Sequence, residues 1–396
     1  MEFKTYKFGE ITVNFDKKRI PLSSAQREKR QGTYRYYGAQ GVIDYIDDYI
    51  FDGTYLLIAE DGENLKSKKQ NIAQIATGQF WVNNHAHIVQ GNELCDTRFL
   101  CYLINCLDLS GYITGSAQPK LSQANLHAVD VTIPEIAVQR KIVDYLYALD
   151  KKIETNSRIN DNLQQHIKLL VTAWLVDYVP FGGEMPSDWH TISLSEIAEF
   201  VSGYSYKGAE LQESTTAMAT IKNFDRNGGF KLDGFKELVP SSKIKPCHYA
   251  EKFDVVVAHT DLTQKAEVIG NAEPIINLSG YEAIVFSMDW VKVVPKDSCI
   301  SKFLLAALLQ DPRFKSHCLG YVNGTTVLHL SKKALPDYEL DFPTDLSVLS
   351  PLDDALRVLY MQMATIVDEN RKLQELRDTL LPRLMSGEID VADIEI

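Results

Sequence analysis

The chain has 396 residues, more than one ordinary domain holds, so we expect two or three domains. Its hydrophobic content of 45% is typical of a folded globular protein and excludes wholesale disorder. The net charge of −12 argues by itself against nucleic-acid binding, although the distribution of charge matters more than the total.

The first notable element in chain order is a basic segment. Between Lys17 and Arg35 there are seven basic residues and one acid, Glu28. The other end of the chain, from Glu388 to Ile396, is acidic. An acidic chain with local basic patches is compatible with binding to nucleic acid but does not establish it.

Short β-rich runs bounded by Gly, Asp or Asn predict strands. They lie at residues 55–59, 72–76, 80–82, 253–258 and 283–286. After the third run come Asn83, Asn84, His85 and His87, with His127 as a further candidate ligand. Histidines at alternating strand positions can bind a metal, but we favour a hydrogen-bonded structural cluster and expect no metal.

The chain repeats itself. Phe3-Lys-Thr-Tyr-Lys-Phe-Gly-Glu-Ile11 matches Trp189-His-Thr-Ile-Ser-Leu-Ser-Glu-Ile197, 186 residues later. Gly115-Ser-Ala-Gln-Pro-Lys-Leu-Ser122 matches Gly324-Thr-Thr-Val-Leu-His-Leu-Ser331, 209 residues later, and this match continues to Pro134 and Pro343. Two matches in the same order indicate a duplicated domain, and the period near 200 residues excludes a solenoid.

Each copy ends in a long predicted helix. The first begins after Pro134-Glu135 and runs to about Tyr178, before Pro180-Phe-Gly-Gly183. The second has Ser350 as its expected N-cap, Pro351 at its first position and Ser386-Gly387 at its end. Apolar residues recur in steps of three and four, which is typical of a coiled coil. At about 1.5 Å per residue, some 40 residues span roughly 60 Å.

Asparagines interrupt both apolar seams, at Asn156 and Asn160 in the first helix and Asn370 in the second. A buried Asn in a coiled coil can fix the register of the two helices. The alternative, that these residues lie at the edge of the seam, is equally compatible with the pattern.

Cysteine spacing and the chain start indicate the compartment. Cys95, Cys101, Cys106, Cys247, Cys299 and Cys318 include no CxxC pair, so we expect reduced structural thiols. No apolar stretch is long enough to span a membrane, and the N-terminus has no signal-peptide core. We therefore expect a cytoplasmic protein.

Several motifs together resemble the specificity subunits of type I restriction-modification systems. In the first copy they are Tyr36-Tyr-Gly-Ala-Gln-Gly-Val-Ile43, Phe51-Asp-Gly-Thr-Tyr55, Glu60-Asp-Gly62 and Phe80-Trp-Val-Asn-Asn-His-Ala-His87. Gly115 to Ser122, Ile133-Pro134 and Gln139 continue the pattern, and Asp378-Thr-Leu-Leu-Pro-Arg383 closes it. The second copy is similar only through Ser202-Gly-Tyr204, Ile221-Lys-Asn223, Phe253-Asp254 and His259-Thr-Asp261.

The resemblance implies a mixed α/β (α+β) fold with two target-recognition domains joined by two antiparallel coiled-coil helices. We expect the first domain at 1–134, its spacer helix at 135–180, the second domain at 181–343, and the second helix with an acidic tail at 344–396. Each domain would read half of a split DNA sequence, and the helices would fix the gap and offer docking surfaces for two methyltransferase subunits. A restriction and translocation subunit would join the complete complex, and S-adenosylmethionine, ATP and Mg²⁺ would belong to these partners.

Under this interpretation we expect DNA contacts from clustered basic and polar residues. In the first copy the candidates are Lys17, Lys18, Arg19, Arg27, Lys29, Arg30, Tyr34, Arg35, Tyr36, Tyr37, Lys66, Lys68, Lys69, Gln70 and Lys120. In the second copy they are Tyr204, Tyr206, Lys207, Lys222, Asn223, Arg226, His259, Thr260, Gln264, Lys265 and His329. Solvated loops are the alternative explanation for the basic segment and for the lysine run.

Three rival functions remain to be compared. A methyltransferase fused to recognition domains would need a cofactor-binding Gly-rich turn and a catalytic Asn/Asp-Pro-Pro-aromatic motif, and neither is found, nor is a GxxxxGK[ST] or GxSxG motif. We therefore expect no catalysis by the chain itself. A coiled-coil scaffold would leave the basic, Tyr-rich segment unexplained, whereas a specificity subunit of a related modification system stays open.

Overall fold

The computed structural model describes residues 2–115, 118–226, 228–296 and 300–391. The chain forms two compact units: unit 1 comprises Met1–Lys152 with Leu373–Ile396, and unit 2 comprises Ile153–Lys372. The unit boundaries therefore fall inside the two long helices. Ser116 and Ala117 of the repeated motif, Cys299 and the last five residues of the acidic tail lie outside the described residues.

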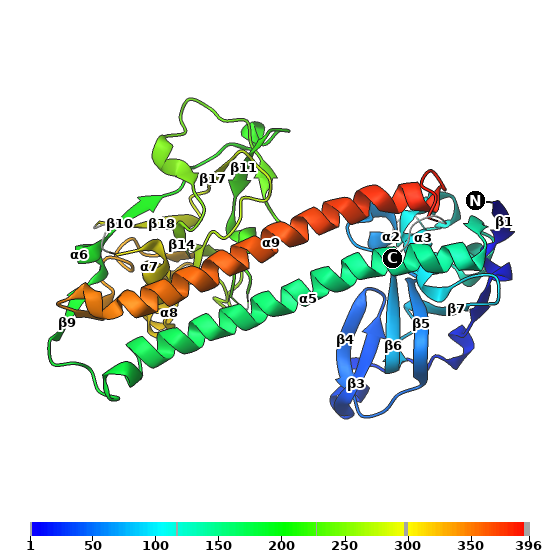
Figure 1. Ribbon diagram of the computed structural model, residues 1–396, viewed down its shortest axis with the longest axis horizontal. Helices are drawn as coiled ribbons and strands as arrows, with labels where there is room; N and C mark the ends of the chain where they lie inside the picture. The colour runs from blue at the N-terminus through cyan, green and yellow to red at the C-terminus, as the bar shows by residue number, and fades with distance from the viewer. Residues whose placement is uncertain (1, 116–117, 227, 297–299, 392–396) are drawn as a thin grey trace. The chain divides into compact units, whose positions relative to one another are not determined.

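Unit 1 is built on a six-stranded sheet in the order β2-β7-β5-β6-β3-β4 (Figure 1). Its strands are β2 (Thr12–Asn14), β3 (Gln31–Gly38), β4 (Gly41–Ile46), β5 (Phe51–Ala59), β6 (Ala73–Val82) and β7 (Ala86–Gly91). The runs expected at 55–59 and 80–82 lie within β5 and β6, as does all but the first residue of the run at 72–76. At the pair Gly53 and Gly78, where β5 faces β6, both residues have positive φ, which favours glycine.

Helices cover one side of this sheet. They are α1 (Ser24–Glu28), α2 (Asn64–Ser67), α3 (Thr97–Cys106) and α4 (Gln123–His127), while β1 (Phe3–Lys7) pairs with β8 (Asp130–Pro134). Asp96 caps α3, and its side chain accepts hydrogen bonds from the backbone amides of Arg98 and Phe99. The core of unit 1 joins Leu56 of β5 and Phe99 of α3 with residues from both long helices, Leu146 and Leu384. Both ends of the chain therefore share one core.

Unit 2 has four small sheets, ordered β10-β18-β14-β16, β12-β11-β17-β13, β15-β20-β19 and β21-β9. The strands are β9 (Trp189–Ser193), β10 (Ala198–Ser202), β11 (Thr216–Ala219), β12 (Lys236–Glu237), β13 (Tyr249–Ala250), β14 (Val255–Ala258), β15 (Thr260–Asp261), β16 (Ala272–Pro274), β17 (Ala283–Phe286), β18 (Trp290–Pro295), β19 (Val322–Asn323), β20 (Leu328–Leu330) and β21 (Glu339–Pro343). Its short helices are α6 (Leu194–Ile197), α7 (Lys302–Leu309) and α8 (Pro312–Leu319). Six consecutive residues of α7, 304–309, are buried in the core, while Lys302 and Phe303 at its start are half-buried.

The sequence repeat corresponds to equivalent strand pairs. In unit 1, β1 pairs with β8 and Phe3 faces Pro134. In unit 2, β9 pairs with β21 and Trp189 faces Pro343. Phe3 and Trp189 begin the first sequence match, and Pro134 and Pro343 end the second. In each copy the start of the first match therefore pairs with the end of the second in one antiparallel strand pair. The duplication inferred from the sequence is confirmed.

The two long helices are α5 (Ile136–Leu175, 40 residues) and α9 (Ser350–Met385, 36 residues), drawn in teal and orange to red in Figure 1. Helix α5 ends before Tyr178 because that residue has a left-handed φ of 50°. The expected N-cap role of Ser350 is wrong: a 3-10 turn at Leu346–Leu349 precedes α9, and Ser350 is itself helical. Among the described residues, no helix combines the length and apolarity that a membrane span requires.

A polar layer interrupts the apolar seam between α5 and α9 in unit 2. Asn156 is buried and donates to Glu369 Oε2 at 2.8 Å and to Asn370 Oδ1 at 2.9 Å. Asn370 donates to the carbonyl oxygen of Ile153 at 3.4 Å. Asn160 is half-buried, and its Oδ1 has no hydrogen-bond partner in the described part of the chain. Asn156 thus lies inside the seam and not at its edge.

Candidate nucleic-acid interface

Two loops of unit 1 form one polar surface, which we call loop pair 1: residues 60–70 together with residues 114–115 and 118–122. The backbone amide of Leu121 donates to the Glu60 carbonyl at 2.8 Å, and Gly62 N donates to Pro119 O at 3.1 Å. Lys66 Nζ also reaches across, to Gly115 O at 3.0 Å. The surface carries exposed Lys66, Lys68, Lys69, Gln70 and Lys120, all predicted as DNA contacts.

Unit 2 has a matching arrangement, loop pair 2, made of residues 259–268 and 323–333. Leu330 N donates to the His259 carbonyl at 2.9 Å, in the same way as Leu121 N to Glu60. Gln264 Nε2 reaches across to Thr325 O at 2.9 Å, as Lys66 does in loop pair 1. Gln264, Lys265 and His329 are exposed. The structure thus brings together candidates that are 50 or more residues apart in both copies.

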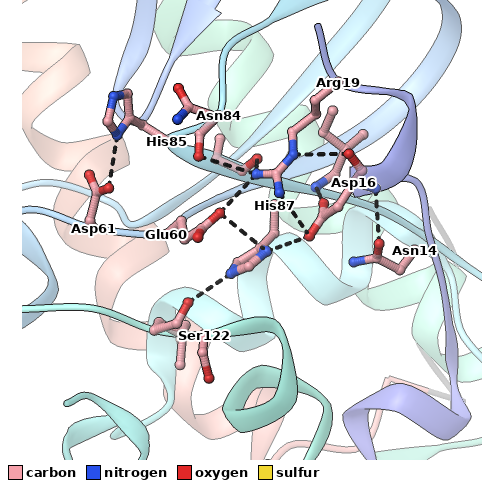
Figure 2. A network of polar contacts seen from close by, with 12 residues as sticks. Asn14, Asp16, Arg19, Glu60, Asp61, Asn84, His85, His87 and Ser122 are labelled. Carbon is pink, nitrogen blue, oxygen red and sulfur yellow. Dashed lines mark hydrogen bonds and ion pairs between the residues drawn. The ribbon is translucent and has the colours of Figure 1, made fainter. Parts of the chain in front are cut away.

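A buried ionic network lies beneath loop pair 1 (Figure 2). His87 Nδ1 lies 2.6 Å from Asp16 Oδ2, and its Nε2 lies 2.7 Å from the Leu121 carbonyl oxygen. Arg19 donates to Glu60 Oε2 at 2.8 Å, and Lys120 Nζ lies 3.3 Å from Glu60 Oε1. Glu60 therefore couples an interior arginine to an exposed lysine of the loop surface.

Both carboxylates of this network are held in the charged form. Burial alone would raise the pKa of Asp16, but hydrogen bonds from His87 and the Ile88 amide, with the charges of His87 and Arg19, lower it below 3.8. Burial likewise opposes the lowered pKa of Glu60, which hydrogen bonds from Arg19 and Lys120 and the charge of His87 bring below 4.5. The network is therefore a fixed electrostatic support for the loops.

The histidine cluster after β6 has a structural explanation. Both ring nitrogens of the buried His87 face hydrogen-bond acceptors, and His85 Nδ1 lies 2.8 Å from Asp61 Oδ2. The Asn83 side chain is buried and accepts from the His85 amide. In the described residues, no group of three or more His, Cys, Asp or Glu side chains could hold a metal ion.

Three arginines predicted to contact phosphates are instead engaged with carboxylates. Arg19 pairs with Glu60 and Asp16 in the interior. Arg27 Nε donates to Asp44 at 2.8 Å and lies over the Tyr36 ring, and Arg30 Nε donates to Asp47 at 2.9 Å. Asp44 and Asp47 neutralise Arg27 and Arg30, and Glu60 and Asp16 neutralise Arg19, so the three arginines are already paired within unit 1. Their DNA contacts stay predictions. Lys17, Lys18, Lys29 and Arg35 stay exposed.

The tyrosines beside this segment belong to the interior. Tyr36 and Tyr37 are buried, and Tyr36 accepts a hydrogen bond from the Leu22 amide at 2.9 Å. Tyr34 is half-buried and packs against Tyr49 with ring centroids 5.1 Å apart. Because their rings are used for packing, these side chains support the sheet and do not face DNA.

Three predicted contacts of the second copy are also buried. Tyr204 donates to Glu210 at 2.8 Å, Asn223 bonds the backbone of its own loop, and Thr260 donates to Asp289 at 3.0 Å. These predictions are corrected because such side chains shape loops from within. Of the others, Lys207, Lys222 and Arg226 are exposed, Arg226 lies 3.5 Å from Glu267, and Tyr206 lies half-buried under Lys236.

Sequence reasoning missed two parts of this surface. The sequence identified Glu60 only as part of the Glu60-Asp-Gly62 motif, although its side chain connects Arg19 to Lys120. Lys332 and Lys333 follow β20 directly and are exposed beside His329. The position of His259, 199 residues after Glu60, could have signalled that these two residues are counterparts.

The chain has two copies of an α/β domain, each with a polar loop pair, and two paired long helices. This arrangement is that of a class of DNA-recognition proteins. Residues 1–165 match the family described as type I restriction modification DNA specificity domain. A putative type I restriction enzyme specificity subunit from Haemophilus influenzae is 36% identical over 140 residues, which are 35% of this chain and 35% of that protein. The match therefore spans about a third of this relative.

Longer matches cover both copies. The HindI specificity subunit of Haemophilus influenzae is 23% identical over 338 residues, 68% of this chain and 71% of that protein. The MjaVIII specificity subunit of Methanocaldococcus jannaschii is 21% identical over 385 residues, 93% and 88% of the two chains. The crystal structure of a type I restriction-modification S subunit from M. genitalium shares the fold, with a TM-score of 0.61, 13% identity and coverage of 97% and 96%.

Residues 1–165 thus match the type I restriction modification DNA specificity domain, and the longer matches over both copies support a DNA-target specificity subunit.

Proposed function

We propose that this specificity subunit reads a bipartite DNA sequence, one half with each copy of the duplicated domain. The observation that carries the proposal is the matched construction of loop pairs 1 and 2. The same cross-loop backbone hydrogen bond occurs in both, from Leu121 N to Glu60 O and from Leu330 N to His259 O. The side chains on the two loop pairs differ, so the two half-sites are expected to differ as well.

In this proposal the chain supplies recognition and its partners supply chemistry. Two methyltransferase subunits modify the DNA, and restriction and translocation subunits join the full complex. S-adenosylmethionine, ATP and Mg²⁺ bind to those subunits. The chain itself is non-catalytic.

An apolar groove on the helix pair of unit 2 supports methyltransferase docking. The groove has a volume of 760 Å³ and is lined by Leu169 and Leu170 of α5 and by Val358 and Leu359 of α9, among others. The Leu169 side chain is 67% exposed and Val358 is 54% exposed. Large apolar side chains exposed together on a helix face favour a protein partner over water.

We further propose that α5 and α9 set the gap between the half-sites and that the Asn156 layer fixes their register. Both helices continue from one unit into the other. Removing one heptad from each helix is expected to change the preferred gap in the DNA target. An unchanged gap with a folded, active complex would end this part of the proposal.

The test of the function is methylome sequencing of cells that express the methyltransferase encoded beside this chain, with and without the chain itself. A split motif whose methylation requires the chain would support the proposal and identify both half-sites. Chain-dependent activity of another kind of enzyme would favour a related modification system. Absence of any chain-dependent methylation, with an active methyltransferase, would favour a coiled-coil scaffold instead.

A further inference from the structure

The two loop pairs carry different chemistry at equivalent positions. In loop pair 1 the facing residues are Glu60 and Lys120, whose charged groups lie 3.3 Å apart. In loop pair 2 the equivalent residues are His259 and His329, placed by the same backbone bond and by the pairing of Thr260 with His329. An ion pair in one copy is therefore replaced by two imidazoles in the other.

The surroundings of the histidine pair are electropositive toward solvent. His329 and Lys332 are exposed, and the positive charges of both act on His259. Two acids lie nearby, and both are already occupied. Asp289 accepts from Thr260 and from Ser287, and the buried Asp261 accepts from backbone amides that include that of Val268.

We propose that loop pair 2 binds a DNA phosphodiester through His259, His329 and Lys332, and that this contact takes up a proton that the matching contact of loop pair 1 does not need. The inference rests on the proposed DNA-reading function and names the ligand group and its proton coupling at one of the two loop pairs.

The proton coupling follows from the charges. Burial, with the positive charges of His329 and Lys332, holds the pKa of His259 below 6.5, and only Asp289 opposes this. A phosphodiester beside the pair favours the charged imidazole, so the pKa of His259 is higher in the DNA complex than in the free protein. Affinity is then greatest below the free-state pKa and falls as pH rises through the bound-state value.

The Lys120 contact of loop pair 1 is expected to lack this dependence between pH 6 and 8. Lysine keeps its charge throughout this range, and the pKa of Glu60 is below 4.5, where it too stays charged. Lys120 can thus contact a phosphate with the same strength across the range. The duplicated chain provides an internal control for the experiment.

The experiment uses the full chain bound to its methyltransferase and a duplex containing the methylated motif. Dissociation constants are measured from pH 6 to 8.5 at constant ionic strength, and proton uptake is measured by calorimetry in two buffers of different ionisation enthalpy. Uptake of one proton weakens binding by up to about tenfold per pH unit above the free-state pKa. A duplex with a scrambled motif reports non-specific binding.

Three variants separate the explanations. His259→Gln removes the imidazole whose pKa the phosphodiester raises, and is expected to flatten the pH profile and weaken binding at pH 6. His329→Lys installs the residue that loop pair 1 uses, and is expected to strengthen binding at pH 8. Lys120→Gln is the matched control, expected to weaken binding equally at every pH. His329 and Lys120 are exposed and His259 is half-buried, and melting curves check that the three variants fold.

Specific binding whose pH profile and proton uptake are the same in the wild type and in His259→Gln would overturn the inference and leave the proposed function intact. Absence of any preference for the motif duplex over the scrambled one would overturn both.

Discussion

Replacing Arg19 with Ala distinguishes a DNA contact from an internal support. The Arg19 side chain is only 17% exposed. Its guanidinium donates to Glu60 at 2.8 Å and to the Ala86 carbonyl at 2.9 Å, and Nε donates to the Asp16 carbonyl at 3.1 Å. We expect the variant to lose stability in unit 1 before it loses any direct phosphate contact.

The magnitude follows from what the substitution leaves behind. The Glu60 carboxylate would keep Lys120 as its ion-pair partner, and three backbone carbonyls, those of Asp16, Asn84 and Ala86, would lose a charged donor. Breaking a buried ion pair by removing one partner costs about 3–5 kcal/mol. The matched control is Lys18→Ala, because Lys18 is exposed on the same segment and its loss should change stability by less than about 0.5 kcal/mol.

Amide hydrogen exchange of the full chain measures this locally. The expected result for Arg19→Ala is faster exchange in β5 to β7, with unchanged exchange in β14 of unit 2 as the internal reference. At low temperature, where the variant is fully folded, its DNA affinity should have the same salt dependence as that of the wild type. Unchanged exchange in β5 to β7 together with a shallower salt dependence would refute the internal role and restore Arg19 as a phosphate contact.

Three other predictions concern the ionic network of unit 1, the Asn156 layer and the apolar groove of unit 2. The pKa values of Asp16 and Glu60 are lowered in the folded protein, so their stabilising effect is present above their ordinary pKa values of 3.8 and 4.5 and is lost as pH falls through the folded-state values. The melting temperature of unit 1 should therefore drop below about pH 4. A melting temperature that stays constant down to pH 2.5 would contradict this. Asn156→Ala should cost about 1 kcal/mol and speed exchange in the middle of α5, with exposed Asn162→Ala of the same helix as its neutral control. Val358→Glu should weaken methyltransferase binding by at least about tenfold without changing the melting curve, and full co-purification of the variant would exclude this face.

Local signals in the sequence were sufficient for the architecture. The steps of three and four predicted both long helices, because a helix must bury one stripe whatever it packs against. The duplication was visible because Phe3 and Trp189 begin, and Pro134 and Pro343 end, the same strand pair in each copy. The N-cap at Ser350 was wrong because a 3-10 turn extends the helical path upstream of it.

The composition of the DNA-facing surface depended on the tertiary structure. A run of basic residues looks the same in sequence whether each charge meets solvent or a carboxylate. Only the pairing of β3 with β4 puts Asp44 against Arg27, and only the packing of β5 and β7 encloses Arg19 with Glu60. The correspondence of His259 with Glu60 likewise appears once the backbone of both copies is traced, whereas that of His329 with Lys120 is already visible in the sequence repeat. Periodicity is a property of neighbouring residues, whereas neutralisation of a charge depends on partners that the chain brings in from far away.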